Sequence, residues 1–317
     1  MKEIMHDELA ARGGSGRATD GARDVAYLCL LDALACAFQA LQDPACTRLL
    51  GPVVPGATMT FGARVPGTSF QLDPVQAAFN LGTMIGWLDQ QDAALATCGA
   101  HLADTLGALL SVADYQARKA LAEGRPPATV RDVLDALLDA AVQRPAERAA
   151  SHRAATMTID RCDAARIACA TSITSLLGAT AMQRARAHHL AAREALVNDA
   201  VVQRPSSWLG DANARGVRIA LLAMAEVPDR AWAWADRVGS QPASSLQPQA
   251  TALSLLQTPD LPACDTSSAQ RIRERFLANA TAHFPPVQAG KLKAALADRS
   301  RLEGMPVNEL VSMTVRN

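Results

Sequence analysis

Apolar residues recur at helical spacing through most of this 317-residue chain. Over residues 24–41, leucine, valine and phenylalanine return every three or four positions until Asp43 and Pro44 end the pattern. Asp73 followed by Pro74 is typical of a helix start and predicts a largely apolar helix as far as Trp87. Similar patterns predict helices over 104–121, 129–142, 163–177, 182–200, 211–226, 269–281 and 286–298, followed by a tail from Arg301. The pattern therefore predicts an all-α protein.

Three segments interrupt the helical pattern. Glycine and proline punctuate residues 50–72, which predicts a short irregular or hairpin segment there. Residues 1–20 are polar and rich in glycine, as in a flexible tail, and residues 238–268 have the serine, proline and glutamine content of a connector. We therefore expect a tail over 1–20 and a single helical domain over 21–317.

Composition narrows the function classes. The chain is 49% apolar and 4% aromatic, and 31 basic residues balance 31 acidic ones. A disordered chain needs fewer apolar residues, and a general nucleic-acid binder needs an excess of basic charge. No signal-peptide pattern and no run of about 18 uncharged apolar residues is present, so we expect a cytoplasmic protein without a membrane segment. The seven cysteines form no C-x-x-C pair and are expected to be reduced core residues, so no metal site is expected.

Acidic residues and a histidine gather around the end of one predicted helix and the start of the next. Asp89 and Asp92 follow the helix that ends at Trp87, and His101 and Asp104 precede the next helix. An imidazole titrates near neutral pH and a neighbouring carboxylate can orient it, so this group can transfer protons. On spacing alone a structural interpretation stays open, in which the first two acids are loop residues and Asp104 is a helix cap.

Several runs of sequence resemble the MmgE/PrpD family, which includes 2-methylcitrate dehydratases and cis-aconitate decarboxylases. These runs are Gly51-Pro-Val-Val-Pro-Gly56, Gly62-Ala-Arg-Val-Pro-Gly-Thr68, the segment 70–80, Trp87-Leu-Asp89, Asp104-x-Leu-Gly107 and Arg301-Leu-Glu-Gly-Met-Pro-Val-Asn-Glu309. The resemblance implies an all-helical domain assembled from both ends of the chain. Family members usually carry a smaller α/β domain inserted between the two halves, and here the connector at 238–268 stands in its place. The resemblance also implies a homodimer that uses no cofactor or metal.

The resemblance implies a set of site residues. The catalytic residues are Asp89, His101 and Asp92, and the substrate-binding residues are Arg161, Asp104, Trp87, Trp208 and Ser206. Two of the family positions that differ here bear most on the chemistry: a histidine aligns with Arg161, and a lysine aligns with Ser206. An arginine can hold a carboxylate in bidentate fashion but cannot act as a base at neutral pH.

We therefore expect a small-molecule lyase or isomerase on a 2-methylcitrate dehydratase scaffold. The substrate is expected to be a carboxylate or a biosynthetic intermediate, and the reaction an elimination, a decarboxylation or a cyclisation by proton transfer. The two changed positions argue against the family's own dehydration reaction. The alternative is a non-catalytic helical binding or partner protein of the same descent.

Overall fold

A computed structural model describes residues 19–89, 102–139, 161–197, 205–225 and 264–316. Helices make up nearly all of the regular structure in these residues, which confirms the predicted all-α class. The first half contains α2 (Asp20–Ala40), α3 (Pro44–Thr47), β1 (Ala63–Arg64), β2 (Gln71–Leu72), α4 (Pro74–Gly86), the 3-10 helix η1 (Leu102–Thr105), α6 (Leu106–Ala122) and a helical stretch over 130–139. The second half contains α8 (Arg161–Leu176), α9 (Ala181–Val197), α10 (Trp208–Met224), α12 (Thr266–His283), α13 (Pro286–Leu296), α14 (Arg299–Glu303) and α15 (Val307–Thr314). Among the described helices, none has both the length and the apolar content needed to span a membrane.

Most helix starts follow from a local capping side chain. Asp73 accepts hydrogen bonds from the amides of Val75 and Gln76, which confirms the predicted start of α4. The other described helices with such a cap are α2, α3, α9, α12, α14 and the stretch over 130–139, capped by Thr19, Asp43, Thr180, Asp265, Asp298 and Thr129. A side chain close in sequence therefore stabilises the start of each of these helices.

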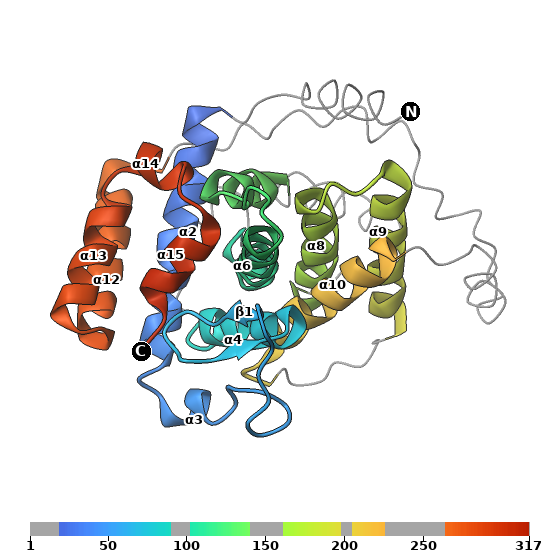
Figure 1. Cartoon of the computed structure of the whole chain (residues 1–317), viewed down its shortest axis with the longest axis horizontal. Coiled ribbons are helices and arrows are strands. Elements are labelled where there is room, and N and C mark those ends of the chain that lie inside the picture. The colour runs from blue at the N-terminus through green and yellow to red at the C-terminus, as the bar shows by residue number, and fades with distance from the viewer. Residues whose placement is uncertain (1–18, 90–101, 140–160, 198–204, 226–263, 317) are drawn as a thin grey trace, which may run out of the picture.

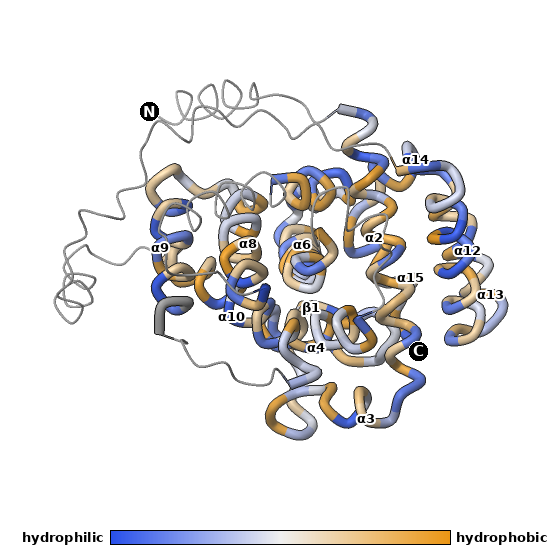
Figure 2. The backbone as a smooth tube through the Cα atoms, turned by 180° about the vertical axis from the view of Figure 1, so that it is seen from behind, coloured by the Kyte–Doolittle hydropathy of each residue, from blue (hydrophilic) through white to orange (hydrophobic). Residues whose placement is uncertain are grey.

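Helix α6 lies in the middle of the molecule, with α4 packed across it (Figure 1). Helix α2 and the C-terminal helices lie on one side of α6, and α8, α9 and α10 lie on the other. Viewed from behind, the hydrophilic residues gather along the outer helices α9, α12 and α13 (Figure 2). The core thus lies along α2, α4, α6 and α8, most of whose residues are buried.

The predicted hairpin is present within residues 50–72. Strands β1 and β2 pair antiparallel, with Ala63 opposite Leu72 and Arg64 opposite Gln71. The amide of Arg64 donates to the buried carboxyl of Asp114 at 2.8 Å, which ties the hairpin to α6. The prediction of an irregular or hairpin segment is confirmed.

The predicted tail after Arg301 is wrong, because this region forms two helices. Asp298 caps α14, and α15 packs against α6 by burying Val307, Leu310 and Val311. These apolar residues have the spacing of one helix face, but the run is too short to stand out in the sequence.

Two other predicted boundaries shift by a few residues. Helix α2 begins at Asp20, inside the predicted tail, and α12 begins at Thr266, inside the predicted connector. The rest of the tail (1–18) and most of the connector (226–263) lie outside the described residues.

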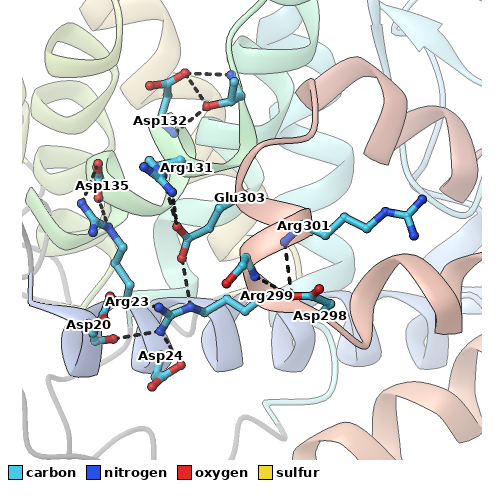
Figure 3. A network of polar contacts seen from close by, with 12 residues as sticks. Asp20, Arg23, Asp24, Arg131, Asp132, Asp135, Asp298, Arg299, Arg301 and Glu303 are labelled. Carbon is cyan, nitrogen blue, oxygen red and sulfur yellow. Dashed lines mark hydrogen bonds and ion pairs between the residues drawn. The ribbon is translucent and has the colours of Figure 1, made fainter.

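A network of charged side chains joins three parts of the chain that are distant in sequence (Figure 3). Glu303 of α14, whose side chain is almost fully buried, pairs with Arg131 and Arg299, each at 3.0 Å. Arg299 also contacts two acids of α2, Asp20 and Asp24. We call Glu303 and these four partners the closing network, because it ties the first described helix to α14 and to the helical stretch over 130–139.

Candidate functional site

Four helix ends meet at one point of the fold. Asp89 lies three residues beyond the end of α4, and Asp104 lies in η1, which runs directly into α6. Arg161 is the first residue of α8, and Trp208 is the first residue of α10. Helix N-termini carry partial positive charge and exposed amides, so three helices starting here favour bound carboxylates.

These residues contact one another through Arg161. Its Nε and Nη2 donate to the two carboxylate oxygens of Asp104 at 3.1 and 3.0 Å, which is a bidentate pair. Its Nη1 donates to Asp89 Oδ1 at 3.0 Å. The centre of the guanidinium lies 5.0 Å from the ring centroid of Trp208, within cation–π distance. We call Arg161, Asp104, Asp89 and Trp208 the Arg161 cluster.

The two carboxylates of the Arg161 cluster differ in their exposure to solvent. The Asp104 side chain is fully buried, whereas the Asp89 side chain is 71% exposed. Burial alone would lower the pKa of Arg161, but the hydrogen bonds and charges of Asp104 and Asp89 outweigh it and raise that pKa above its usual value. Arg161 is therefore always positive and can stabilise negative charge, but it cannot accept a proton near neutral pH.

Asp89 has an unusual backbone conformation. Its φ of +47° lies in the left-handed region, which aspartate enters more readily than most other residues. Its amide donates to the carbonyl of Gly86 at 3.3 Å, and its carboxylate is held by Arg161. Among the residues of the Arg161 cluster, Asp89 thus presents the acid that solvent or a substrate can reach.

The structural interpretation of Asp104 as a helix cap does not fit its contacts. Its carboxylate pairs with Arg161, and the N-cap position of α6 is occupied by Thr105. The backbone carbonyl of Asp104 accepts a hydrogen bond from Asn213 Nδ2 at 2.8 Å. Sequence reasoning missed Asn213, although a lone polar residue on the apolar face that includes Leu209 and Val217 was a usable signal.

The other predicted site residues fall outside the Arg161 cluster or outside the described residues. The indole N–H of Trp87 donates to Asp43 Oδ2 at 2.8 Å, so this residue joins the end of α4 to the cap of α3. Ser206 lies exposed in the turn that precedes α10. His101 and Asp92 lie within 90–101, which is not described.

The described residues contain no group of three or more histidine, cysteine, aspartate or glutamate side chains arranged to hold a metal ion. Two of the buried cysteines also have low reactivity: burial raises the pKa of both Cys36 and Cys46 to about 12.

Comparison with known proteins identifies the family of this chain. The model of the MmgE/PrpD N-terminal domain matches residues 15–250. The chain belongs to the MmgE/PrpD family. This confirms the resemblance found in the sequence, and all four residues of the Arg161 cluster lie within the matched MmgE/PrpD segment.

Relatives in this family are named as dehydratases. The chain is 41% identical to the 2-methylcitrate dehydratase of Escherichia coli over 215 residues, which cover 64% of this chain and 43% of that protein. It is 42% identical over 215 residues to the 2-methylcitrate dehydratase of Cupriavidus necator, again 43% of the relative's length. A mitochondrial 2-methylcitrate dehydratase of Yarrowia lipolytica is 46% identical over 121 residues, 23% of its length. The match thus spans less than half of each of these relatives.

Proposed function

We propose that this protein is a lyase that removes a proton from a small carboxylate substrate at the Arg161 cluster. The observation that carries the proposal is the exposed carboxylate of Asp89 beside the permanently charged Arg161, where three helices begin. The named relatives are dehydratases, and dehydration is an elimination that starts with or includes loss of a proton. Because the match covers less than half of these relatives, their activity is extended to this chain only as a proposal.

Each residue of the Arg161 cluster has a proposed role. The bidentate edge of Arg161 already holds Asp104, so a substrate carboxylate reaches the guanidinium at Nη1, in place of Asp89. A carboxylate separated from a neighbouring guanidinium is a stronger base, so binding of substrate would also prepare Asp89 to accept the proton. Trp208 supplies a flat apolar face beside Arg161. His101 and Asp92 are proposed to share the proton transfer.

The choice among reactions follows from two family positions at which this chain has no base. The family histidine and lysine positions hold Arg161 and Ser206, neither of which is a base at neutral pH. Citrate-type dehydration needs an acid for the leaving hydroxyl as well as a base for the proton. We therefore favour reactions that need one base, namely a simple elimination, a decarboxylation, an isomerisation or a cyclisation.

Proton NMR in D₂O tests this proposal directly. Wild-type protein and the His101→Ala variant are incubated with 2-methylcitrate, citrate and cis-aconitate, and deuterium uptake and new products are followed. The proposal predicts uptake or turnover of at least one acid by wild type and its loss in the variant. Equal uptake by the two proteins would refute proton transfer by His101, and silence with all three acids would exclude the relatives' substrates.

A non-catalytic binding protein is the second candidate. It is favoured by the contacts of Arg161, since three of its nitrogens already bind protein carboxylates and form a closed ion cluster. This candidate predicts that Asp89→Asn and His101→Ala leave every measurable ligand affinity unchanged. A loss of turnover in either variant would favour the enzyme.

The proposal includes the family's homodimer and a cytoplasmic location. Light scattering after gel filtration checks the first part and should give twice the chain mass of 33.4 kDa. A mass equal to one chain would remove the dimer from the proposal.

A further inference from the structure

Helix α6 begins without a cap of its own. Its N-cap residue, Thr105, makes no capping hydrogen bond, and the Thr105 hydroxyl instead donates to the carbonyl of Leu102 at 3.1 Å. The third helical residue, Ala108, has no carbonyl within the helix to bond, and a cap side chain usually accepts from this amide or the one before it. Helices α10, α13 and α15 likewise have no capping side chain, whereas most other described helices have a local one. The amide of Ala108 instead bonds a side chain from another part of the chain.

Asn213 of α10 provides the missing cap. Its Oδ1 accepts from the amide of Ala108 at 2.6 Å, across 105 positions of sequence. Its Nδ2 donates to the carbonyls of Asp104 and Leu209, each at 2.8 Å. The side chain is fully buried, and each of these hydrogen bonds holds backbone. One amide thus joins the start of α6, the backbone of Asp104 and the first turn of α10.

The packing around Asn213 leaves its side chain little freedom to shift. A Cβ at Gly107 would lie 2.9 Å from Asn213 Oδ1 and 2.7 Å from the backbone nitrogen of Gly82. A Cβ at Gly82 would lie 3.1 Å from Asn213 Cβ. Both positions need glycine because α4, α6 and α10 approach one another through their backbones at this point. The Asn213 amide is therefore fixed by three helices.

We infer that Asn213 is the positioning residue of the Arg161 cluster. By holding the carbonyl of Asp104 and the first turn of α6, it fixes where the buried Asp104 carboxylate lies. Asp104 in turn orients Arg161 through the bidentate pair, and Arg161 holds Asp89. A role of Asn213 in catalysis rests on the proposed function. Its role in positioning Asp104 and Arg161 rests only on these contacts.

The side-chain Nε–H of Arg161 reports this positioning without any substrate. It donates to Asp104 in the wild-type protein, so its ¹⁵N–¹H signal should be shifted and slow to exchange with water. Absence of the signal from Arg161→Lys identifies it. In Asn213→Ala we expect its exchange with water to quicken about tenfold, as for loss of one hydrogen bond of ordinary strength. Unchanged exchange and shift in a folded Asn213→Ala protein would overturn the inference.

Asn80→Ala is the matched control. Asn80 is also fully buried, and it also ties two segments together through backbone, because its side chain bonds the amide and the carbonyl of Gly51 at 3.3 and 3.2 Å. Its loss should destabilise the fold while leaving the Arg161 Nε–H signal as in wild type. An equal change of that signal in both variants would mean that Asn213 acts only through general stability, and would overturn the inference.

A wild-type measurement covers the case in which Asn213→Ala does not fold. The amide of Ala108 should exchange with deuterium as slowly as amides inside α6, although its position in the first turn would otherwise leave it unprotected. Exchange as fast as an uncapped first turn would contradict the inference. Where a substrate is found, Asn213→Ala should lower kcat and leave KM nearly unchanged. Absence of turnover in wild type would refute the proposed function and leave the Nε–H result to decide on Asn213.

Discussion

The closing network and the Arg161 cluster are built from the same chemical groups but differ in arrangement. In the closing network one buried carboxylate, Glu303, is shared by two arginines, and one of these, Arg299, is surrounded by further acids. In the Arg161 cluster one arginine is shared by two carboxylates, the buried Asp104 and the exposed Asp89. Both regions include helix starts, since Asp20 and Arg299 are the first residues of α2 and α14, but the Arg161 cluster also has the Trp208 ring beside its arginine.

Paired charges occur in both regions, so they do not by themselves single out the proposed site. In the closing network the central carboxylate is inaccessible, so its contacts stabilise the fold. In the Arg161 cluster the buried pair of Arg161 and Asp104 holds a second, accessible carboxylate. This is the carboxylate of Asp89, whose backbone is left-handed. Exposed acids and helix starts occur in both regions, so the features that distinguish the cluster are the left-handed backbone of Asp89 and the aromatic face of Trp208. The following predictions test that distinction, in order of their expected effect on the free energy of unfolding.

Removing the buried acid of the Arg161 cluster should have the largest effect. Asp104→Ala leaves the half-buried Arg161 without its bidentate partner, and breaking such a pair costs about 3–5 kcal/mol when both groups are buried. Because Arg161 keeps some exposure, we expect the lower end of that range, about 3 kcal/mol. Urea unfolding measures it. A change below about 1 kcal/mol, the usual value of an exposed pair, would show that the cluster adds no support.

Asp114 is a third buried acid, and it is useful for the comparison because no arginine side chain among the described residues forms an ion pair with it. Asp114 is fully buried; its Oδ2 accepts from the Arg64 amide and its Oδ1 has no hydrogen-bond partner. Burial raises the pKa of Asp114 to about 6, despite the amide bond and the charges of Arg118 and Arg64. The folded state therefore binds this proton more tightly than the unfolded state, and stability should fall as pH rises from about 4 to about 6.

The variant Asp114→Asn tests that pH dependence. It should remove the contribution of this residue and raise the free energy of unfolding at pH 7 by about 2–3 kcal/mol, given about 1.4 kcal/mol per pKa unit. Urea unfolding at pH 4, 5, 6 and 7 measures the slope in both proteins. An identical slope in wild type and variant would contradict the account of Asp114.

Weakening the closing network should lower stability without changing activity. Glu303→Gln removes the charge shared by Arg131 and Arg299, and we expect a loss of about 2 kcal/mol, as for a buried charged hydrogen bond. Activity per folded molecule should equal that of wild type. Thermal unfolding and turnover, measured on the same sample, check both parts, and a selective loss of turnover would break the distinction between the two regions.

Neutralising the exposed acid should have the smallest effect on stability. The carboxylate of Asp89 is largely exposed, so Asp89→Asn should change the free energy of unfolding by no more than about 0.5 kcal/mol. Its effect on proton transfer should nevertheless be a loss of at least about 100-fold, the usual contribution of a general base. A large loss of stability, measured by urea unfolding, would instead make Asp89 a structural residue.

Much of the fold could be predicted because its signals are local. Helix α4 begins where Asp73 and Pro74 predict, and the hairpin lies within the predicted segment. Helix α15 was missed because its buried face has only three apolar residues, Val307, Leu310 and Val311. A run this short becomes a helix through its contact with α6, which the spacing of residues does not reveal.

The candidate site could also be predicted only in part, because some of its contacts join segments that are distant in sequence. Spacing singled out Asp89 and Asp104, the resemblance added Arg161 and Trp208, and the structure brings the four residues together. The sequence could not show that Arg161 is already held by protein carboxylates, or that Asn213 caps a helix more than 100 positions away. Both are contacts between segments distant in sequence, which depend on packing rather than on local pattern.

Deuterium uptake by one substrate in two variants tests the central claim most directly. Asp89→Asn and Glu303→Gln each neutralise one carboxylate that pairs with arginine, the first in the Arg161 cluster and the second in the closing network. With any carboxylate substrate that wild-type protein labels in D₂O, the account predicts that Asp89→Asn loses the labelling and that Glu303→Gln keeps it. Labelling retained by Asp89→Asn, or lost equally in both variants, would contradict the claim that the Arg161 cluster performs proton transfer.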